Sequence, residues 1–470
     1  MLNLKPNSNI SIVLWLLVIW LFTDAIVIYR INSIGAFTSL GSLRTLEYIQ
    51  KNGHADPATV RLNQSYTSWA LALNMTDPSN YIKTGLGFAE GKGLNLKNIN
   101  PTDPTSFTYI PYYFQGPGTP LVIGFMIKLF GERNILPYFM LVGYLHFITA
   151  LLTCVLASKF LEDKFYVFIA GVLSLLYPAV LAYHFGIGLF ASEPLVMPFM
   201  VLSLIALTNF WQGLNKGNYS YTKIILNALA YGGVLGCASY FRDIYASYAL
   251  FSFFILLLSA LLKRKWFKQI ALFVLVGSII MFAVEYPWQK RNQKYFGEFT
   301  MSGSSYCGFS MWQQVWSNPK ETDQWIPNGA VGLGYYLAPE KSKEVLELIS
   351  KDKKAGNRLA WHTFIEVLVK NPIRALTFKL SPYDTLWFGQ RYNWYIYLWC
   401  MLSTLSFMAF LFITRFKFEP ALWIFPLFLI GISVLAHYEH RYVEPFFLFV
   451  TPITVAYIIS YFRKRITRAI

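Results

Sequence analysis

The stretch ILPYFMLVGYLHFITALLTCVLASKFLEDKFYVFIAGVLSLLYPAVLAY, residues 135–183, contains two apolar runs joined by a short link that carries Lys159 and Lys164. Each run is about 20 residues long, and a helix of that length crosses a hydrocarbon core about 30 Å thick. The pattern therefore indicates two membrane-spanning helices connected outside the bilayer.

Apolar runs of this kind recur at residues 10–29, 135–158, 165–183, 193–211, 223–241, 244–262, 269–286, 394–414, 420–436 and 445–462. Of the 470 residues, 55% are hydrophobic and only 14% are charged, whereas roughly 25% are charged in soluble domains. This composition excludes an ordinary soluble globular protein. The sequence predicts an all-α polytopic membrane protein with about ten transmembrane helices. The first run has no small-residue cleavage site after it, so we expect an uncleaved anchor.

The net charge of +16, from 40 Lys and Arg against 24 Asp and Glu, is compatible in itself with a nucleic-acid-binding surface. The position of the charges argues against that class. The short links carry most of the excess, at Lys159, Lys164, Lys216, Lys223, Lys263, Arg264, Lys265, Lys268, Arg415, Lys417, Arg463, Lys464, Arg465 and Arg468. Because cationic loops stay on the cytoplasmic side, ten alternating spans place these links and both termini inside. We expect membrane lipids as partners and no nucleic acid.

The same alternation places two long segments outside, about 31–134 and 287–393. It divides the chain into three parts. The first is a transmembrane module, 1–286, and it includes the first exoplasmic loop. The second is an exoplasmic segment, 287–393, and the third consists of C-terminal transmembrane helices, 394–470. Both outer segments contain helical-looking stretches, such as 357–370, and are expected to be partly helical and folded against the membrane. Residues 121–130 are apolar but too short to span, which favours an interfacial or re-entrant helix.

Ionisable groups gather at the expected outer ends of the spans, although such groups are expensive in hydrocarbon. The set comprises Asp24, His184, Glu193, Arg242, Asp243, Glu285 and the run HYEHRYVEP at 437–445. Cations can bind a lipid-linked phosphate and a carboxylate can deprotonate a hydroxyl. The alternative is that these are interface residues or helix caps. As a set on one side, they favour a functional site.

Two stretches of the first outer segment resemble a known family. TDPSNYIKTGLGFAEGKGL, residues 76–94, has an acidic residue, then Tyr, then a helix closing on Gly-x-Gly, and FQGPGTPLVIGFMIKLFGE, residues 114–132, has Pro-Gly-x-Pro and ends in Leu-Phe-Gly. This order is similar to the first exoplasmic loop of the GT-C glycosyltransferases. In particular it resembles the bacterial relatives of dolichyl-phosphate-mannose protein mannosyltransferases, the glycosyltransferase family 39 type, and the lipid A aminoarabinose transferases.

Three further stretches continue the resemblance: ASEPLVMPFMVLSLIAL at 191–207, EYPWQKRNQKYFGEF at 285–299 and HRYVEPFFLFVTP at 440–452. They look like the family's Ser-Glu-Pro-Leu, Pro-Trp-x-x-Arg-Asn and Arg-Tyr-x-x-Pro motifs. The chain also departs from the pattern. The protein mannosyltransferases carry adjacent Asp-Glu in the first loop, whereas Asp77 is followed by Pro78, and residues 31–75 have no counterpart.

The resemblance implies an inverting transfer of a sugar from a polyprenyl-phosphate carrier to an acceptor hydroxyl on the periplasmic or exoplasmic side of a bacterial inner (plasma) membrane. The acceptor is a lipid, a glycan or a protein. Because the leaving phosphate is already anionic, the enzyme must mainly stabilise that charge and deprotonate the attacking hydroxyl. Phosphate-binding loops for soluble nucleotides are missing from the sequence, which favours a lipid-linked donor.

Asp77 matches the family's first-loop acid and is assigned as general base, with an N-cap of the following helix as the alternative. Tyr81, from the same motif, is assigned to substrate binding. Arg242 and Arg441 are the candidates for the phosphate, because a guanidinium offers a fixed fork to its oxygens. For Arg242 the alternative is an ion pair with Asp243.

The remaining candidates have weaker claims. Glu193 matches the Ser-Glu motif and is expected to orient a histidine or arginine of another span, or else to cap its helix. His437 and His440 are assigned to substrate binding. With His184 they also suggest a metal site, but no His-x-x-x-His pair with a third ligand is present, so a divalent metal is not supported and no cofactor is expected.

Two other functions share parts of this pattern. A transporter or lipid flippase would carry ionisable residues and broken helices near the bilayer midplane. A polysaccharide ligase or polymerase would share both the topology and the outer-face chemistry.

Three other charged or polar residues are expected to have structural roles. Arg291 and Asn292 are expected to form a structural junction between span and loop, and Asp24 is expected to pair within the bundle.

Overall fold

The computed structural model describes residues 8–33, 76–99, 107–112, 116–131, 136–176, 192–217, 220–263, 266–302, 344, 347–348, 351–370, 393–415, 417, 419–435 and 446–469. Within these residues the protein is helical apart from one two-stranded sheet. The predicted fold class, an all-α membrane protein, is confirmed.

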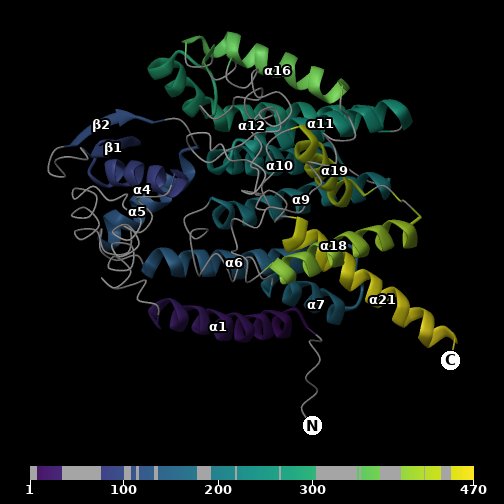
Figure 1. Ribbon diagram of the computed structural model, residues 1–470. Coiled ribbons are helices and arrows are strands. Elements are labelled where there is room, and N and C mark those ends of the chain that lie inside the picture. Colours follow the sequence, from purple (N-terminus) through teal and green to yellow (C-terminus); the bar gives the residue numbers. More distant parts are fainter. Residues whose placement is uncertain are drawn as a thin grey trace.

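Each expected span contains a helix. The helices are α1 (Asn9–Ser33), α6 (Leu136–Ala157), α7 (Lys164–Leu175), α9 (Glu193–Asn215), α10 (Tyr221–Phe241), α11 (Ile244–Lys263), α12 (Phe267–Phe296), α18 (Asn393–Ile413), α19 (Pro420–Leu435) and α21 (Thr451–Ala469). A π-helical turn, η3 (Phe446–Val450), leads into α21. In Figure 1 the long helices lie broadly side by side.

Six described helices are long and apolar enough to cross a membrane: α1, α6, α9, α10, α11 and α12. The total of about ten spans therefore stays a prediction. Helix α12 continues to Phe296, ten residues beyond the expected end of its span at 286. The domain boundary drawn at residue 286 falls inside this helix.

Close helix contact in the bundle depends on small residues. A Cβ atom added to Gly232 of α10 would lie 2.1 Å from the carbonyl oxygen of Gly277 in α12, so the two backbones touch at this crossing. Small residues commonly permit such approaches between membrane helices. The main core is completed by aromatic side chains, among them Phe210 of α9 and Phe273 of α12, whose rings stack with centroids 4.0 Å apart.

Helix ends follow ordinary capping rules. Asp163 accepts a hydrogen bond from the Phe165 N–H at the start of α7, and Ser220 accepts one from the Lys223 N–H at the start of α10. The last turn of α12 ends at Gly297, whose φ of 71° lies in the left-handed region that favours glycine.

The links expected on the cytoplasmic side meet at one end of the bundle. Lys464 of α21 forms an ion pair with Glu162 at 2.8 Å, and the Gln212 amide of α9 donates to the Lys159 carbonyl. Trp211, also late in α9, packs edge-on against Trp266 before α12. The hydrogen bond from Lys464 lowers the pKa of Glu162 below its ordinary value. The basic links are therefore neighbours, as the alternation of spans requires.

At the opposite end the first outer segment contributes helix α4 (Thr76–Ala89), strands β1 (Asn95–Ile99) and β2 (Phe107–Pro111), and helix α5 (Gly118–Phe130), as Figure 1 shows. Helix α5 contains the short apolar helix expected at 121–130. The antiparallel hairpin, which pairs Asn95 with Pro111 and Ile99 with Phe107, is not anticipated by the sequence analysis.

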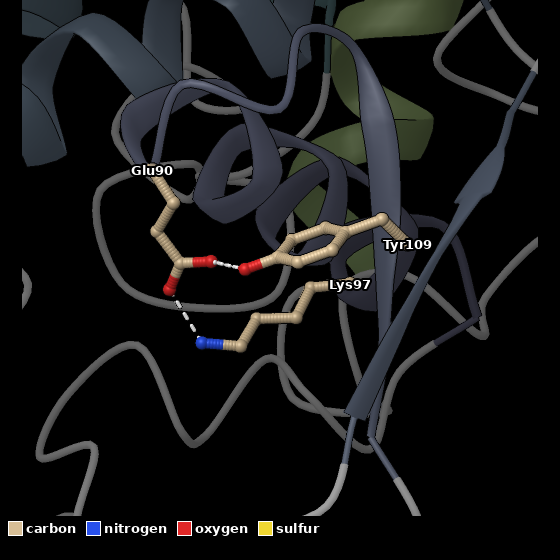
Figure 2. A network of polar contacts seen from close by, with 3 residues as sticks. All are labelled: Glu90, Lys97 and Tyr109. Atoms are coloured by element: carbon tan, nitrogen blue, oxygen red, sulfur yellow. Dashed lines mark hydrogen bonds and ion pairs between the residues drawn. The ribbon is translucent and has the colours of Figure 1, made fainter.

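The hairpin is fixed to α4 by close packing and by a polar network. A Cβ atom on Gly87 would lie 2.0 Å from the Asn95 carbonyl oxygen, so α4 and β1 are in backbone contact. The Glu90 carboxylate accepts hydrogen bonds from the Lys97 ammonium and the Tyr109 hydroxyl, one from each strand, as Figure 2 shows. One carboxylate at the end of α4 therefore ties both strands to the helix.

The second outer segment is represented mainly by α16 (Lys353–Lys370). The helical stretch expected at 357–370 is confirmed and begins four residues earlier, at Lys353. Most of the rest of this segment lies outside the described residues.

Candidate functional site

Helices α4 and α5 pack together through two glycines. A Cβ atom on Gly85 would lie 3.1 Å from the Pro120 carbonyl oxygen, and one on Gly124 would lie 2.7 Å from the Gly85 carbonyl oxygen. Farther along, the rings of Phe88 and Phe125 are in contact, with centroids 5.1 Å apart. The paired positions rise together along both helices, so the helices run in the same direction, and the first turn of α5 lies beside the middle of α4 around Gly85.

The start of α5 also touches the C-terminal end of α10. A Cβ atom on Gly116 would lie 2.2 Å from the Tyr240 carbonyl oxygen, and one on Gly118 would lie 2.8 Å from the Phe241 ring. A larger residue at either position would force the two segments apart. The turn of residues 116–118 is thus held beside the residue that follows Phe241, which is Arg242.

Tyr81 joins α4 to the transmembrane bundle. Its side chain is 2% exposed and belongs to an apolar cluster that includes Tyr138 of α6 and Leu195 of α9. Tyr81, Tyr138 and Glu193 are close enough to interact electrostatically. The tyrosine assigned to substrate binding therefore lies where three helices meet, next to a carboxylate.

Glu193 and Arg242 form a buried ion pair at this junction. Oε1 of Glu193 lies 2.8 Å from Nη2 of Arg242, and the two side chains are 2% and 12% exposed. Glu193 is the first residue of α9, where the positive end of the helix dipole favours a carboxylate. The pair agrees with the expectation that Glu193 orients a basic residue of another span.

The structure corrects the alternative partner considered for Arg242. Among the described residues, the ion pair of Arg242 is with Glu193 rather than with the adjacent Asp243. The backbone of Arg242 is extended, with φ −149° and ψ 120°, and successive side chains of an extended segment point to opposite sides. Asp243 accepts a hydrogen bond from the Ser302 hydroxyl, beyond the end of α12.

Asp77 is the second residue of α4, which begins at Thr76. Asp77 therefore lies inside the first turn of the helix, and the alternative that it is the N-cap residue is wrong. An acidic residue in the first turn still benefits from the helix dipole. Its side chain lies outside the described residues, and its backbone lies in the first turn of α4, about two helical turns before Gly85, which contacts the start of α5.

Other candidates fall on parts of the chain that the structure does not describe, namely His184, His437, His440 and Arg441. Asp24 of α1 is half-buried, and no ion pair links it to another described residue, so its pairing stays a prediction. Within the described residues no group of three His, Cys, Asp or Glu side chains could hold a metal. The metal prediction is untested, because the three histidines that raised it are not described.

Glu285 of α12 is 4% exposed and accepts a hydrogen bond from the Gln289 amide at 3.1 Å. The sequence placed it among the outer-end carboxylates, and the structure places it on the part of α12 that packs against α10. It therefore belongs to the same end of the bundle as Glu193 and Arg242.

Arg291 ties α12 to the base of the hairpin. Its guanidinium donates to the carbonyls of Leu94 and Tyr112, both at 3.1 Å, which flank β1 and β2. The guanidinium also lies over the Trp288 ring, 4.2 Å from its centroid. Asn292, the next residue, donates to the Thr300 carbonyl at 2.8 Å. These contacts support the interpretation of the motif as a structural junction.

Two residues at this end are absent from the sequence analysis. Lys83 of α4 is half-buried, and burial lowers the pKa of its ammonium. Thr119, the second residue of α5, is fully buried. Neither stands out in the sequence, because a single Lys or Thr in a mixed helix is common.

Comparison with known proteins finds one similar solved structure, at low sequence identity. No family model and no curated protein matches the sequence. Among solved structures, the chain is similar to the archaeal oligosaccharyltransferase AglB from Archaeoglobus fulgidus, in complex with an inhibitory peptide and a dolichol-phosphate, with a TM-score of 0.47 and 11% identity. The match covers 83% of this chain and 47% of AglB, so the chain spans about half the length of that protein. A likeness this slight assigns no activity, and the function is argued from the site.

Proposed function

We propose that this membrane protein is an inverting glycosyltransferase that moves a sugar from a polyprenyl-phosphate carrier to an acceptor hydroxyl on the exoplasmic side. The observation that supports the proposal most is the buried Glu193–Arg242 ion pair, 2.8 Å long, at the end of the bundle where α4 and α5 dock. The motifs that resemble the GT-C glycosyltransferases supply residues of this same end.

Arg242 is the proposed contact for the donor phosphate. A guanidinium remains charged at all physiological pH values and binds phosphate oxygens through two parallel hydrogen bonds. Glu193 compensates the charge of Arg242 while the site is empty and holds the guanidinium in one orientation. Arg441, His437 and His440 are proposed to complete the donor site on the basis of their motif.

Asp77 is the proposed general base. The acceptor oxygen attacks the anomeric carbon, the bond from that carbon to the phosphate oxygen breaks, and polyprenyl phosphate leaves with the electron pair. Asp77 takes the proton of the attacking hydroxyl. A single displacement of this kind inverts the anomeric configuration. Tyr81, one helical turn after Asp77 on α4, is proposed to position the substrate.

The test uses the purified full chain in lipid vesicles supplied with a panel of polyprenyl-phosphate sugars. Release of polyprenyl phosphate should fall by about 10²- to 10⁴-fold in Asp77→Asn, because general-base catalysis contributes on that order. Arg242→Ala should also lose release. Glu162→Gln, a conservative change at the opposite end of the bundle, is the matched control and should keep the native rate.

Native rates in both Asp77→Asn and Arg242→Ala would show that the site is wrong. A ligase or polymerase of the same topology is distinguished by its product, because it would transfer a glycan chain from a diphosphate carrier and leave the monophosphate-linked sugar intact.

A further inference from the structure

The first turn of α5 offers backbone donors that no side chain caps. The N-cap residue is Pro117, and no side chain of the described residues caps the helix there. Pro120 has no N–H, and the Leu121 N–H is bonded to the Pro117 carbonyl at 3.0 Å. The N–H groups of Gly118 and Thr119 are therefore the two donors of this turn that have no acceptor within the helix.

A buried hydroxyl accompanies these two donors. Thr119 is 0% exposed, and its Oγ1 has no hydrogen-bond partner among the described residues. Side chains of a helix tilt toward its N-terminus, so this hydroxyl lies at the same end as the Gly118 and Thr119 N–H groups. A buried polar group without a partner is destabilising, which makes Thr119 an unusual choice unless a ligand completes its hydrogen bonding.

The surroundings of this turn favour an anion. The positive end of a helix dipole together with unpaired N–H groups binds phosphate and similar groups. The absence of side chains at Gly116 and Gly118 brings the turn against Tyr240 and Phe241, next to Arg242. The turn that carries the three donors thus lies against the two residues that precede Arg242.

Thr84 provides a comparison within the same helix pair. It is 1% exposed and its Oγ1 also has no partner among the described residues, but it lies in the interior of α4, where the backbone N–H groups are used by the helix. Thr84 is therefore a buried threonine without a partner that is not itself part of a helix N-terminus.

We propose that the start of α5 is a phosphate-binding subsite in which the N–H groups of Gly118 and Thr119 and the Thr119 hydroxyl bind the oxygens of a phosphate monoester or diester. The assignment to the donor lipid's phosphate rests on the proposed function. Together with Arg242, the subsite holds the phosphate both in the donor and in the leaving polyprenyl phosphate.

The test measures equilibrium binding of radiolabelled polyprenyl phosphate to the purified full chain in detergent, with polyprenol and inorganic phosphate as further probes. Thr119→Val removes the hydroxyl and keeps the shape of the side chain, and it should weaken binding of polyprenyl phosphate by about 10- to 100-fold, the effect of one hydrogen bond to a charged group. Thr119→Ser keeps the hydroxyl and should bind within a few-fold of the native chain. Thr84→Val is the matched control and should bind like the native chain.

Thermal denaturation without ligand shows whether the variants fold, and neither valine variant should be destabilised, because each removes an unpartnered hydroxyl. Native-like binding by Thr119→Val overturns the proposal, as does an equal loss in Thr84→Val or equally tight binding of polyprenol by the native chain. Thr119-dependent binding of inorganic phosphate supports the subsite, and its affinity relative to polyprenyl phosphate shows whether the lipid is needed.

The two proposals fail separately. Thr119-dependent phosphate binding without any sugar transfer would retain the subsite and reject the glycosyltransferase. Sugar transfer by the native chain together with native-like phosphate binding in Thr119→Val would retain the enzyme and reject the subsite.

Discussion

Replacing one partner of the Glu193–Arg242 ion pair should destabilise the protein about as much as replacing both. At 2.8 Å, two unit charges attract by about 6 kcal/mol at an effective dielectric constant of about 20. Loss of solvation on burial offsets much of this attraction, but removing one partner leaves the other charge buried, at a cost of about 3–5 kcal/mol. We therefore expect a loss of this size in both Glu193→Gln and Arg242→Met.

The double variant Glu193→Gln/Arg242→Met should lose about as much as either single variant rather than their sum, because no buried charge remains. The expected coupling energy therefore has the size of one single loss, about 3–5 kcal/mol. The assay is reversible unfolding in mixed micelles, with the fraction folded followed as denaturing detergent is added. Additive losses would refute the argument from the buried pair.

Asp243→Asn is the matched control for this cycle, since it removes the carboxylate adjacent to Arg242 in the sequence. Combined with Arg242→Met it should show almost no coupling. If Arg242 couples to Asp243 and not to Glu193, the assignment of the pair is wrong.

Three further outcomes are expected. Gly232→Ala should cost about 1–3 kcal/mol of folding stability through overpacking, whereas Gly233→Ala, whose Cβ would meet its nearest neighbour at an ordinary 3.6 Å, should be nearly neutral in the same unfolding assay. Arg291→Ala should speed amide hydrogen exchange in the hairpin, and Arg291→Lys should restore protection only in part, because an ammonium cannot reproduce the two-pronged contact. The Glu162–Lys464 bond lowers the pKa of Glu162, so its contribution is present above the ordinary carboxyl pKa and lost on acidification; native and Lys464→Ala should differ in thermal stability near neutral pH and become equal in acid.

The positions of the helices could be predicted because hydrocarbon thickness sets the length of an apolar helix. Ten runs chosen by length and by their basic flanks each coincide with a helix, from α1 to α21. The end of α12 could not be predicted in this way. Residues 287–296 are polar, and their helix is held by specific contacts such as the Trp288 indole donating to the Met301 carbonyl, which hydropathy does not register.

The hairpin was missed for a related reason. The strand segments NLKNI and FTYIP are short, and what makes them strands is their pairing and the Glu90 network, both of which depend on distant residues. The sequence predicted that Glu193 and Arg242 lie at the same end of the bundle, and they form an ion pair there. This was predictable because ionisable residues are costly in hydrocarbon and therefore gather near the ends of spans. The sequence did not identify Glu193 as the partner of Arg242, because the two residues are 49 positions apart in the chain. The neighbouring carboxylate, Asp243, was the obvious alternative, but the extended backbone at Arg242 directs the two side chains to opposite sides.

The central claim is that this end of the bundle cleaves a polyprenyl-phosphate-linked sugar and passes the sugar to a hydroxyl. The most direct measurement follows one set of native vesicles for two events at once: release of polyprenyl phosphate from a labelled donor, and movement of intact donor between the leaflets. The account predicts release with inversion at the anomeric carbon in the product and no movement beyond that of protein-free vesicles. Movement of intact donor without cleavage would contradict it and identify a lipid transporter.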